Sequence, residues 1–269
     1  MSKPSVLITG ASSGMGRATA LFLAEKDFLV YAGSRTPKKL ENLHPNIHPL
    51  ALDISNPKSI QSALSSIQTI DILINNAGYG LVSTVEDVSE TQMQAQFDIN
   101  VFGTLRVTQA IIPKMRAKNS GIIINISSFL GKIGLPLLTL YNASKYAVEG
   151  ITDSLRYELA PFNIRVHSIM PGFFETNFAK DNLIINEKTM QENSPYAKTV
   201  STLAPTIIEQ INNGNDATEV AQLIYNIIQD NTFKARVTAG EKAQKFIPMK
   251  KELSDEDFER RVREYYNLG

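Results

Sequence analysis

Short apolar runs alternate with amphipathic segments along the chain. The runs are rich in Val, Ile and other residues that favour strands. They lie at residues 6–9, 28–32, 47–52, 70–74, 121–127, 164–170 and 235–238. The segments between them place apolar residues at helical spacing. Strands that alternate with helices predict a parallel sheet covered by helices on both faces. We therefore expect one doubly wound α/β domain that contains about seven strands.

Several polar residues mark the expected helix starts. Thr36 and Asn56 each precede a proline, which is favourable at the first helical position. Residues 89–92 and 216–219 each begin with Ser or Asp and end with Gln or Glu, as capping boxes do. Two long helices are expected at about residues 91–118 and 142–160.

Two regions depart from the alternation. Residues 173–215 are long, mixed in composition and contain two prolines, and we interpret them as an inserted helical flap. The domain that includes this flap is expected to span residues 1–240. Residues 241–269 then form a charged helical extension, interpreted as a solvated surface helix, with a partner-binding element as the alternative.

Composition narrows the function classes. The 269 residues include 27 basic and 27 acidic side chains, three His and no Cys. A formal net charge of zero provides no electrostatic footprint for nucleic acid, so we expect no nucleic-acid partner. The absence of Cys excludes disulfides, thiolate metal sites and Cys nucleophiles. Three His disfavour a His-rich zinc site, so no metal is expected.

Two expectations concern location. Charged residues interrupt the apolar runs, and none approaches the roughly 20 apolar residues of a membrane-spanning helix. The N-terminus leads directly into the first strand and carries no export signal. We therefore expect a cytoplasmic protein with no integral membrane segment.

A glycine-rich turn follows the first strand. Gly10, Gly14 and Gly16 precede a helical pattern over residues 17–26. Glycines in this position allow a pyrophosphate to approach the N–H groups and the positive dipole at a helix N-terminus. A tight turn without a ligand is the alternative, but the place between the first strand and the first helix favours a dinucleotide.

The end of the second strand bears on which dinucleotide binds. An acidic residue there accepts a hydrogen bond from the ribose 2′-hydroxyl of NAD, whereas an arginine accommodates the 2′-phosphate of NADP. Ser34 and Arg35 occupy this position, and no carboxylate does. The sequence therefore predicts a preference for NADP(H), with NAD(H) also accepted. The alternative is that Arg35 is an ordinary surface charge.

Further short motifs follow the later strands in a fixed order. They are Asn75-Asn76-Ala77-Gly78, Asn100 in a long helix, Ser127-Ser128, Tyr141 with Lys145, and Pro171-Gly172. With the glycine turn, this set closely resembles the short-chain dehydrogenase/reductase family over residues 5–240. The resemblance extends to its NADP-preferring members and to 17-beta-hydroxysteroid and retinol dehydrogenases. It implies a Rossmann fold, a dinucleotide-binding and catalytic domain over residues 1–240, and oxidoreductase activity on a carbonyl or alcohol.

The catalytic chemistry centres on one helix. Tyr141 and Lys145 are four residues apart, so they share a helix face, and a nearby ammonium lowers the pKa of a phenol. The resemblance implies that Tyr141 donates or accepts the proton and that Lys145 also holds the nicotinamide ribose. It assigns Ser128, thirteen positions before Tyr141, to the substrate oxygen, and Ser127 to a structural role. Asn100 would organise a water relay, or stabilise a helix kink.

The same resemblance implies a set of cofactor contacts. Asp53 would bind the adenine amino group, and Thr176 the nicotinamide carboxamide or the diphosphate. The full set is Gly10, Ser12, Ser13, Gly14, Met15, Gly16, Ser34, Arg35, Asp53, Ile54, Asn76, Ala77, Gly78, Tyr141, Lys145, Pro171, Gly172 and Thr176.

Apolar loops are expected around Tyr141. They are Tyr79-Gly80-Leu81-Val82, Phe129 and Leu130, residues 133–140, and Phe173, Phe174 and Phe178 with Leu183-Ile184-Ile185. A bulky apolar ketone, aldehyde or secondary alcohol fits such a lining. Packing of a lid on the domain is the alternative. The resemblance also implies a homodimer or homotetramer. A catalytically silent regulatory or scaffolding protein that binds the cofactor is the alternative to an enzyme.

Overall fold

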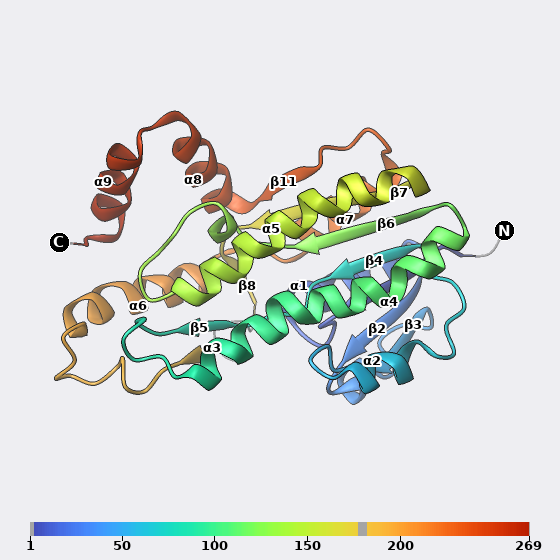
Figure 1. Cartoon of the computed structure of the whole chain (residues 1–269), viewed down its shortest axis with the longest axis horizontal. Coiled ribbons are helices and arrows are strands. Elements are labelled where there is room, and N and C mark those ends of the chain that lie inside the picture. Colours follow the sequence, from blue (N-terminus) through green and yellow to red (C-terminus); the bar gives the residue numbers. More distant parts are fainter. Residues whose placement is uncertain (1–2, 177–181, 269) are drawn as a thin grey trace.

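Seven parallel strands form the central sheet of the computed structural model, in the order β11-β7-β6-β4-β1-β2-β3 (Figure 1). The structure describes residues 3–176 and 182–268. The strands are β1 (Ser5–Thr9), β2 (Leu29–Ser34), β3 (Ile47–Ala51), β4 (Ile72–Asn75), β6 (Gly121–Ile126), β7 (Ile164–Pro171) and β11 (Arg236–Ala239). Each of the seven apolar runs contributes one strand, so the predicted doubly wound sheet is confirmed.

Helices cover both faces of this sheet. On one face, α1 (Gly14–Glu25) packs beside α7 (Thr218–Gln229), and their apolar residues share a core with the strands. On the other face lie α2 (Pro57–Leu64), α4 (Thr104–Ala117) and α5 (Thr139–Leu159). Figure 1 shows α4 and α5 crossing in front of the strands. The central strands are therefore buried on both sides, which explains their continuous apolar sequences.

The expected long helix before β6 has a π-helical turn inside it. It consists of α3 (Glu90–Phe97), the π-helical residues Asp98–Gly103, and α4. Ser89 and Gln92 form the predicted capping box at its start, and Asn56 caps α2 as predicted. The helix expected after Thr36 is only the 3₁₀ turn Pro37–Leu40, because the chain enters β3 a few residues later. At residues 216–219 the carboxylate of Glu219 accepts from Asn215 and does not close a capping box.

A second layer of elements gathers at the carboxyl ends of the strands. β5 (Gly80–Val82) pairs with β9 (Leu183–Ile185), and β8 (Phe174–Glu175) pairs with β10 (Asn215–Asp216). α6 (Ala197–Asn212), α8 (Gly240–Glu252) and α9 (Asp255–Tyr266) lie at this end of the molecule (Figure 1). Within residues 3–176 and 182–268, every helix is too short or too polar to cross a membrane.

The C-terminal helices are more than a solvated surface. Phe246 of α8 and Phe258, Val262 and Tyr266 of α9 are buried in an apolar cluster that also contains Phe129. The charged residues of α9 lie on its exposed side, where they form ion pairs three and four residues apart. The tail therefore adds an apolar wall to the carboxyl end of the sheet.

Candidate active site

The glycine turn between β1 and α1 lies directly against the segment that follows β4. Gly10 has a φ of +67°, and a Cβ atom there would lie 2.8 Å from the Cα atom of Ala77. A Cβ atom at Gly16 would lie 2.5 Å from the carbonyl oxygen of Gly10. Larger residues at these two positions would therefore separate the turn from the neighbouring segment.

Asn76 holds this junction together. Its backbone N–H donates to the Thr9 hydroxyl at 3.0 Å. Its side-chain amide donates to the carbonyl oxygens of Thr9 at 3.0 Å and Gly10 at 3.1 Å. The sheet order changes direction between β1 and β4, and a crevice is expected where it does. These hydrogen bonds therefore shape the crevice floor.

A cleft of about 350 Å³ opens above this floor. It collects residues from β2, β6 and α5 and from the segments that follow β1, β3 and β4, which are far apart in the sequence. The predicted cofactor residues that line it are Gly10, Ser12, Ser13, Gly14, Met15, Ser34, Arg35, Asp53, Ile54, Asn76, Ala77, Gly78, Tyr141, Lys145 and Thr176. Gly16 packs beneath the turn, while Pro171 and Gly172 line an adjoining pocket. Sequence reasoning missed Ala95, Ile99 and Ile126, which also line the cleft. Tyr79 and Ile184, predicted in the apolar loops around Tyr141, line it as well.

Arg35 lies at the mouth of the cleft. It is exposed, and among the described residues its guanidinium has no hydrogen-bond or ion-pair partner. Ser34 is buried, and its hydroxyl accepts from the N–H of Thr36 at 3.0 Å. Asp53 accepts from the backbone and hydroxyl of Ser55, at 3.0 Å and 2.7 Å. A cationic group is thus available at the end of β2.

Tyr141 lines both the cleft and the adjoining apolar pocket, and Ser128, its hydrogen-bond partner, lines that pocket. Ser128 follows β6 and Tyr141 lies in the first turn of α5. Burial raises the pKa of Tyr141 to about 12, and a hydrogen bond with Ser128 opposes this rise. The expected lowering of the Tyr141 pKa is therefore wrong for this structure, because burial outweighs the hydrogen bond with Ser128. The phenol is protonated at neutral pH.

Lys145 lies one turn further along the same buried face of α5. Its side chain is only 6% exposed, and its Nζ donates to the carbonyl oxygen of Ile126 at 2.9 Å. The Nζ atom lies 5.7 Å from the centre of the Tyr141 ring. Burial lowers the pKa of Lys145 to about 8, although the charge of Glu149 opposes this effect. The ammonium and the phenol thus share one side of the cleft.

Asn100 lies behind the cleft, in the π-helical turn. Its amide nitrogen donates to the carbonyl of Tyr79 at 2.9 Å and to the hydroxyl of Ser144 at 3.0 Å. Ser144 in turn donates to the carbonyl of Tyr141 at 2.7 Å. Asn100 therefore connects the segment after β4 to the helix turn that carries Tyr141. Its predicted part in a water relay stays a prediction.

A small apolar pocket of about 70 Å³ adjoins Ser128 and Tyr141. The predicted loop residues Phe129, Leu130, Leu138, Phe173, Phe174 and Leu183 line it. Ile207 and Ile211 of α6 also line it; their spacing of four residues was the only sequence signal for this contribution. The predicted Phe178 lies outside the described residues. Ile184 faces the larger cleft instead.

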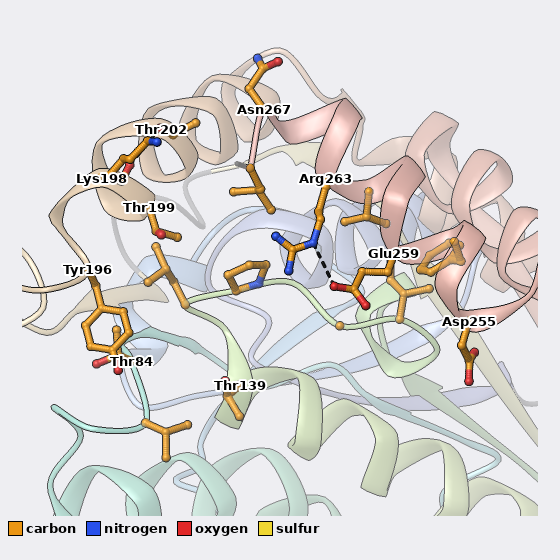
Figure 2. Close-up of a pocket in the computed structure, with 18 of the residues that line it drawn as sticks. Thr84, Thr139, Tyr196, Lys198, Thr199, Thr202, Asp255, Glu259, Arg263 and Asn267 are labelled. Carbon is orange, nitrogen blue, oxygen red and sulfur yellow. Dashed lines mark hydrogen bonds and ion pairs between the residues drawn. The ribbon is translucent and has the colours of Figure 1, made fainter.

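A larger hollow lies beside this pocket. It is a groove of about 810 Å³ between α6, α9 and the loop before α5 (Figure 2). Figure 2 shows Arg263 and Glu259 of α9 joined across one wall, with an Nε–Oε1 distance of 2.9 Å. Leu137 lines the groove while Leu138 lines the apolar pocket, so these consecutive residues separate the two hollows. Ser128, Tyr141 and Lys145 do not line the groove.

Known proteins resemble this chain over nearly its whole length. A family model described as short chain dehydrogenase matches residues 4–184. A 3-ketodihydrosphingosine reductase from Bacteroides thetaiotaomicron is 36% identical over 268 residues, which is 98% of each chain. Neither match bears on the predicted likeness to hydroxysteroid and retinol dehydrogenases, which stays a prediction.

Solved structures of similar proteins share the fold. A short-chain dehydrogenase from Streptomyces avermitilis superposes with a TM-score of 0.83 at 29% identity, covering 99% of this chain and 97% of that one. One from Burkholderia cenocepacia, in complex with NADP, has a TM-score of 0.77 at 26% identity and covers 99% and 98%. One from Burkholderia phymatum, in complex with NAD, has a TM-score of 0.78 at 25% identity and covers 96% and 95%.

Proposed function

Because the chain belongs to the short-chain dehydrogenase family, whose members are oxidoreductases, we propose that it reduces the carbonyl of a bulky apolar substrate with NADPH. The reverse reaction would oxidise the corresponding secondary alcohol. One observation carries this proposal: Tyr141 lines both the cleft and the apolar pocket, and Ser128 lines the pocket beside it. A cofactor in the cleft and a carbonyl in the pocket would therefore meet at these two side chains.

The side chains support a proton transfer to the carbonyl oxygen. When bound, the nicotinamide supplies a hydride to the carbonyl carbon. Tyr141 then gives its phenolic proton to the oxygen, and its pKa of about 12 keeps that proton in place at neutral pH. The Ser128 hydroxyl donates a hydrogen bond to the developing oxyanion. The Lys145 ammonium stabilises the resulting phenolate. In the reverse reaction Tyr141 accepts the proton.

The cleft fits a dinucleotide in this chain's own geometry. The turn that carries Gly10 and Gly14 lines the cleft at the N-terminus of α1, where backbone N–H groups would hold a pyrophosphate. Arg35 would hold the 2′-phosphate, Asp53 the adenine, and Lys145 the ribose of the nicotinamide. The exposed guanidinium of Arg35, together with the absence of a carboxylate at the end of β2, favours NADP(H) over NAD(H). Related structures contain either cofactor, so the preference needs a direct test.

The apolar side chains that line the pocket beside Tyr141 favour a lipophilic group next to the substrate carbonyl. The name of the Bacteroides relative points to a ketone on a long alkyl chain. We propose a long-chain ketone of this kind as the first substrate to test. NADPH oxidation at 340 nm, about the absorbance maximum of the reduced nicotinamide, would be followed with 3-ketodihydrosphingosine and with short apolar ketones. Turnover that depends on Tyr141 supports the enzyme. Tight NADPH binding without turnover of any ketone would instead support the regulatory or scaffolding alternative.

We also propose that the chain forms a homodimer or homotetramer through α4 and α5. Both helices carry exposed large apolar residues: Leu105 of α4 is 37% exposed, and Tyr157 of α5 is 79% exposed. Exposed apolar groups on two neighbouring long helices favour an interface with a second copy. Light scattering coupled to gel filtration would give the mass. A monomer at micromolar concentration would contradict this proposal.

A further inference from the structure

A buried carboxylate lies one helical turn beyond Lys145. Glu149 and Lys145 are four residues apart on α5, so their side chains share the face that packs on the sheet. Glu149 is 2% exposed and Lys145 is 6% exposed. Lys145 donates to the carbonyl of Ile126 on β6, while Glu149 accepts from the hydroxyl of Ser168 on β7. The two charged groups thus lie over adjacent strands, away from bulk water.

Cations from two other elements face Glu149. The Arg236 side chain of β11 donates to its carboxylate at 2.6 Å. Lys132, which follows the turn after Ser128, places its Nζ 3.4 Å from the same carboxylate. Arg236 also pairs with Asp153 of α5 at 2.5 Å. This buried network therefore connects α5, β7, β11 and the loop after β6.

The charges that act on Lys145 are few. Tyr141 faces it from the same helix and is protonated at neutral pH. A Cβ atom at Gly78 would lie 3.8 Å from the Lys145 Nζ and 3.1 Å from the Asn100 amide oxygen, and neither Gly78 nor Asn100 carries a charge. Burial lowers the pKa of Lys145, and Glu149 is the carboxylate that raises it. Without that carboxylate, the ammonium would lose its proton at a lower pH.

We propose that Glu149 is a positioning residue that keeps Lys145 charged, with Arg236 and Lys132 setting how strongly it does so. The role of the ammonium in the reaction rests on the proposed function, but the coupling between the two side chains does not. Glu149 itself touches neither the cleft nor the apolar pocket. Its effect on the reaction would be transmitted through the charge of Lys145.

The pKa of Lys145 can be measured directly in the full-length protein. Lysines labelled with ¹³C at Cε would be titrated by NMR, and the Lys145 signal assigned by its loss in Lys145→Met. We expect Glu149→Gln to lower the midpoint by about one pH unit or more. The matched control is Asp153→Asn, which removes the half-exposed second carboxylate on Arg236 and should lower the midpoint far less than Glu149→Gln does. Equal midpoints in the wild type and Glu149→Gln, or an equal shift in Asp153→Asn, would overturn the proposal.

A second variant moves the pKa in the opposite direction. Lys132 is partly exposed, so Lys132→Gln should fold even where Glu149→Gln does not. Removing this cation leaves the charge of Glu149 less balanced, and we expect the Lys145 midpoint to rise. A fall in the midpoint would contradict the coupling. The alkaline limb of the rate against pH should shift in the same direction as each midpoint. Shifted NMR midpoints without any carbonyl reduction would contradict the proposed function and leave the coupling intact.

Discussion

The side-chain amide of Asn100 makes two opposed hydrogen bonds with the backbone of Tyr79. Its oxygen accepts from the Tyr79 N–H at 3.0 Å, and its nitrogen donates to the Tyr79 carbonyl at 2.9 Å. An extended strand would satisfy the same backbone groups in the same way. The π-helical turn brings Asn100 to this position, where it stands in for a strand beside the segment that lines the cleft.

Replacing Asn100 should therefore destabilise the cleft wall. We expect Asn100→Ala to lower the free energy of unfolding by about 1–3 kcal/mol, because the part-buried Tyr79 N–H loses its acceptor while the Tyr79 carbonyl keeps only the Gln96 amide. Urea denaturation would measure the loss. Gln109→Ala, at an exposed position on α4, is the control and should change stability by less than about 0.5 kcal/mol. Equal stability of Asn100→Ala and the wild type would show that the Tyr79 contacts contribute nothing.

Removing the phenolic hydroxyl should separate chemistry from cofactor binding. For Tyr141→Phe we expect kcat to fall by about 10²–10⁴-fold, because the proton donor is lost. The Kd for NADPH should stay within about twofold, since the ring is retained. Stopped-flow absorbance and fluorescence titration measure the two quantities. Tyr146→Phe, on the exposed side of the same helix, is the control. Unchanged kcat in Tyr141→Phe would remove Tyr141 from the mechanism.

Arg35 should select between the two cofactors. We expect Arg35→Ser to raise the Kd for NADPH by about 10–100-fold, because a charge-assisted hydrogen bond to the 2′-phosphate is lost. The Kd for NADH, which lacks that phosphate, should hardly change. Lys39→Ser, at a nearby exposed position outside the cleft, is the control. Parallel weakening of both cofactors would mean that Arg35 does not recognise the 2′-phosphate.

The buried ammonium of Lys145 should destabilise the folded protein by an amount that depends on pH. Its pKa of about 8 in the folded protein lies below its ordinary value of 10.5, so the folded state binds fewer protons between these pH values. The free energy of unfolding of the wild type should therefore rise, through Lys145, as pH increases from about 8 to 10.5. We expect Lys145→Met to be inactive yet about 1–3 kcal/mol more stable at pH 7.

The advantage of Lys145→Met should shrink above pH 8, because the wild-type side chain then becomes neutral on its own. Thermal unfolding at pH 7, 8 and 9 would follow this trend. Lys58→Met, at an exposed position on α2, controls for loss of charge alone. A stability difference that stays constant from pH 7 to pH 9 would contradict the low pKa of Lys145.

Local patterns predicted most of the fold. The apolar runs fall on strands, and those of the central strands β1 and β4 are continuous because these strands are buried on both faces. Asn56 and Ser89 cap helices as predicted, because a cap bonds only to the next few N–H groups. The prediction of a helix after Thr36 was wrong. Helix propensity is a local property, and it does not report that β3 begins a few residues later.

The sequence by itself determined which residue types were available: glycines after the first strand, an arginine after the second, and a tyrosine four residues before a lysine. Only the tertiary structure decided their electrostatics and their neighbours. Burial raises the pKa of Tyr141, where spacing alone predicted a fall, because desolvation depends on everything packed around the ring. Glu149, Arg236 and Lys132 likewise form one network although they lie on separate elements. Spacing along the chain reports contacts within one helix, whereas burial and charge coupling arise when distant elements pack together.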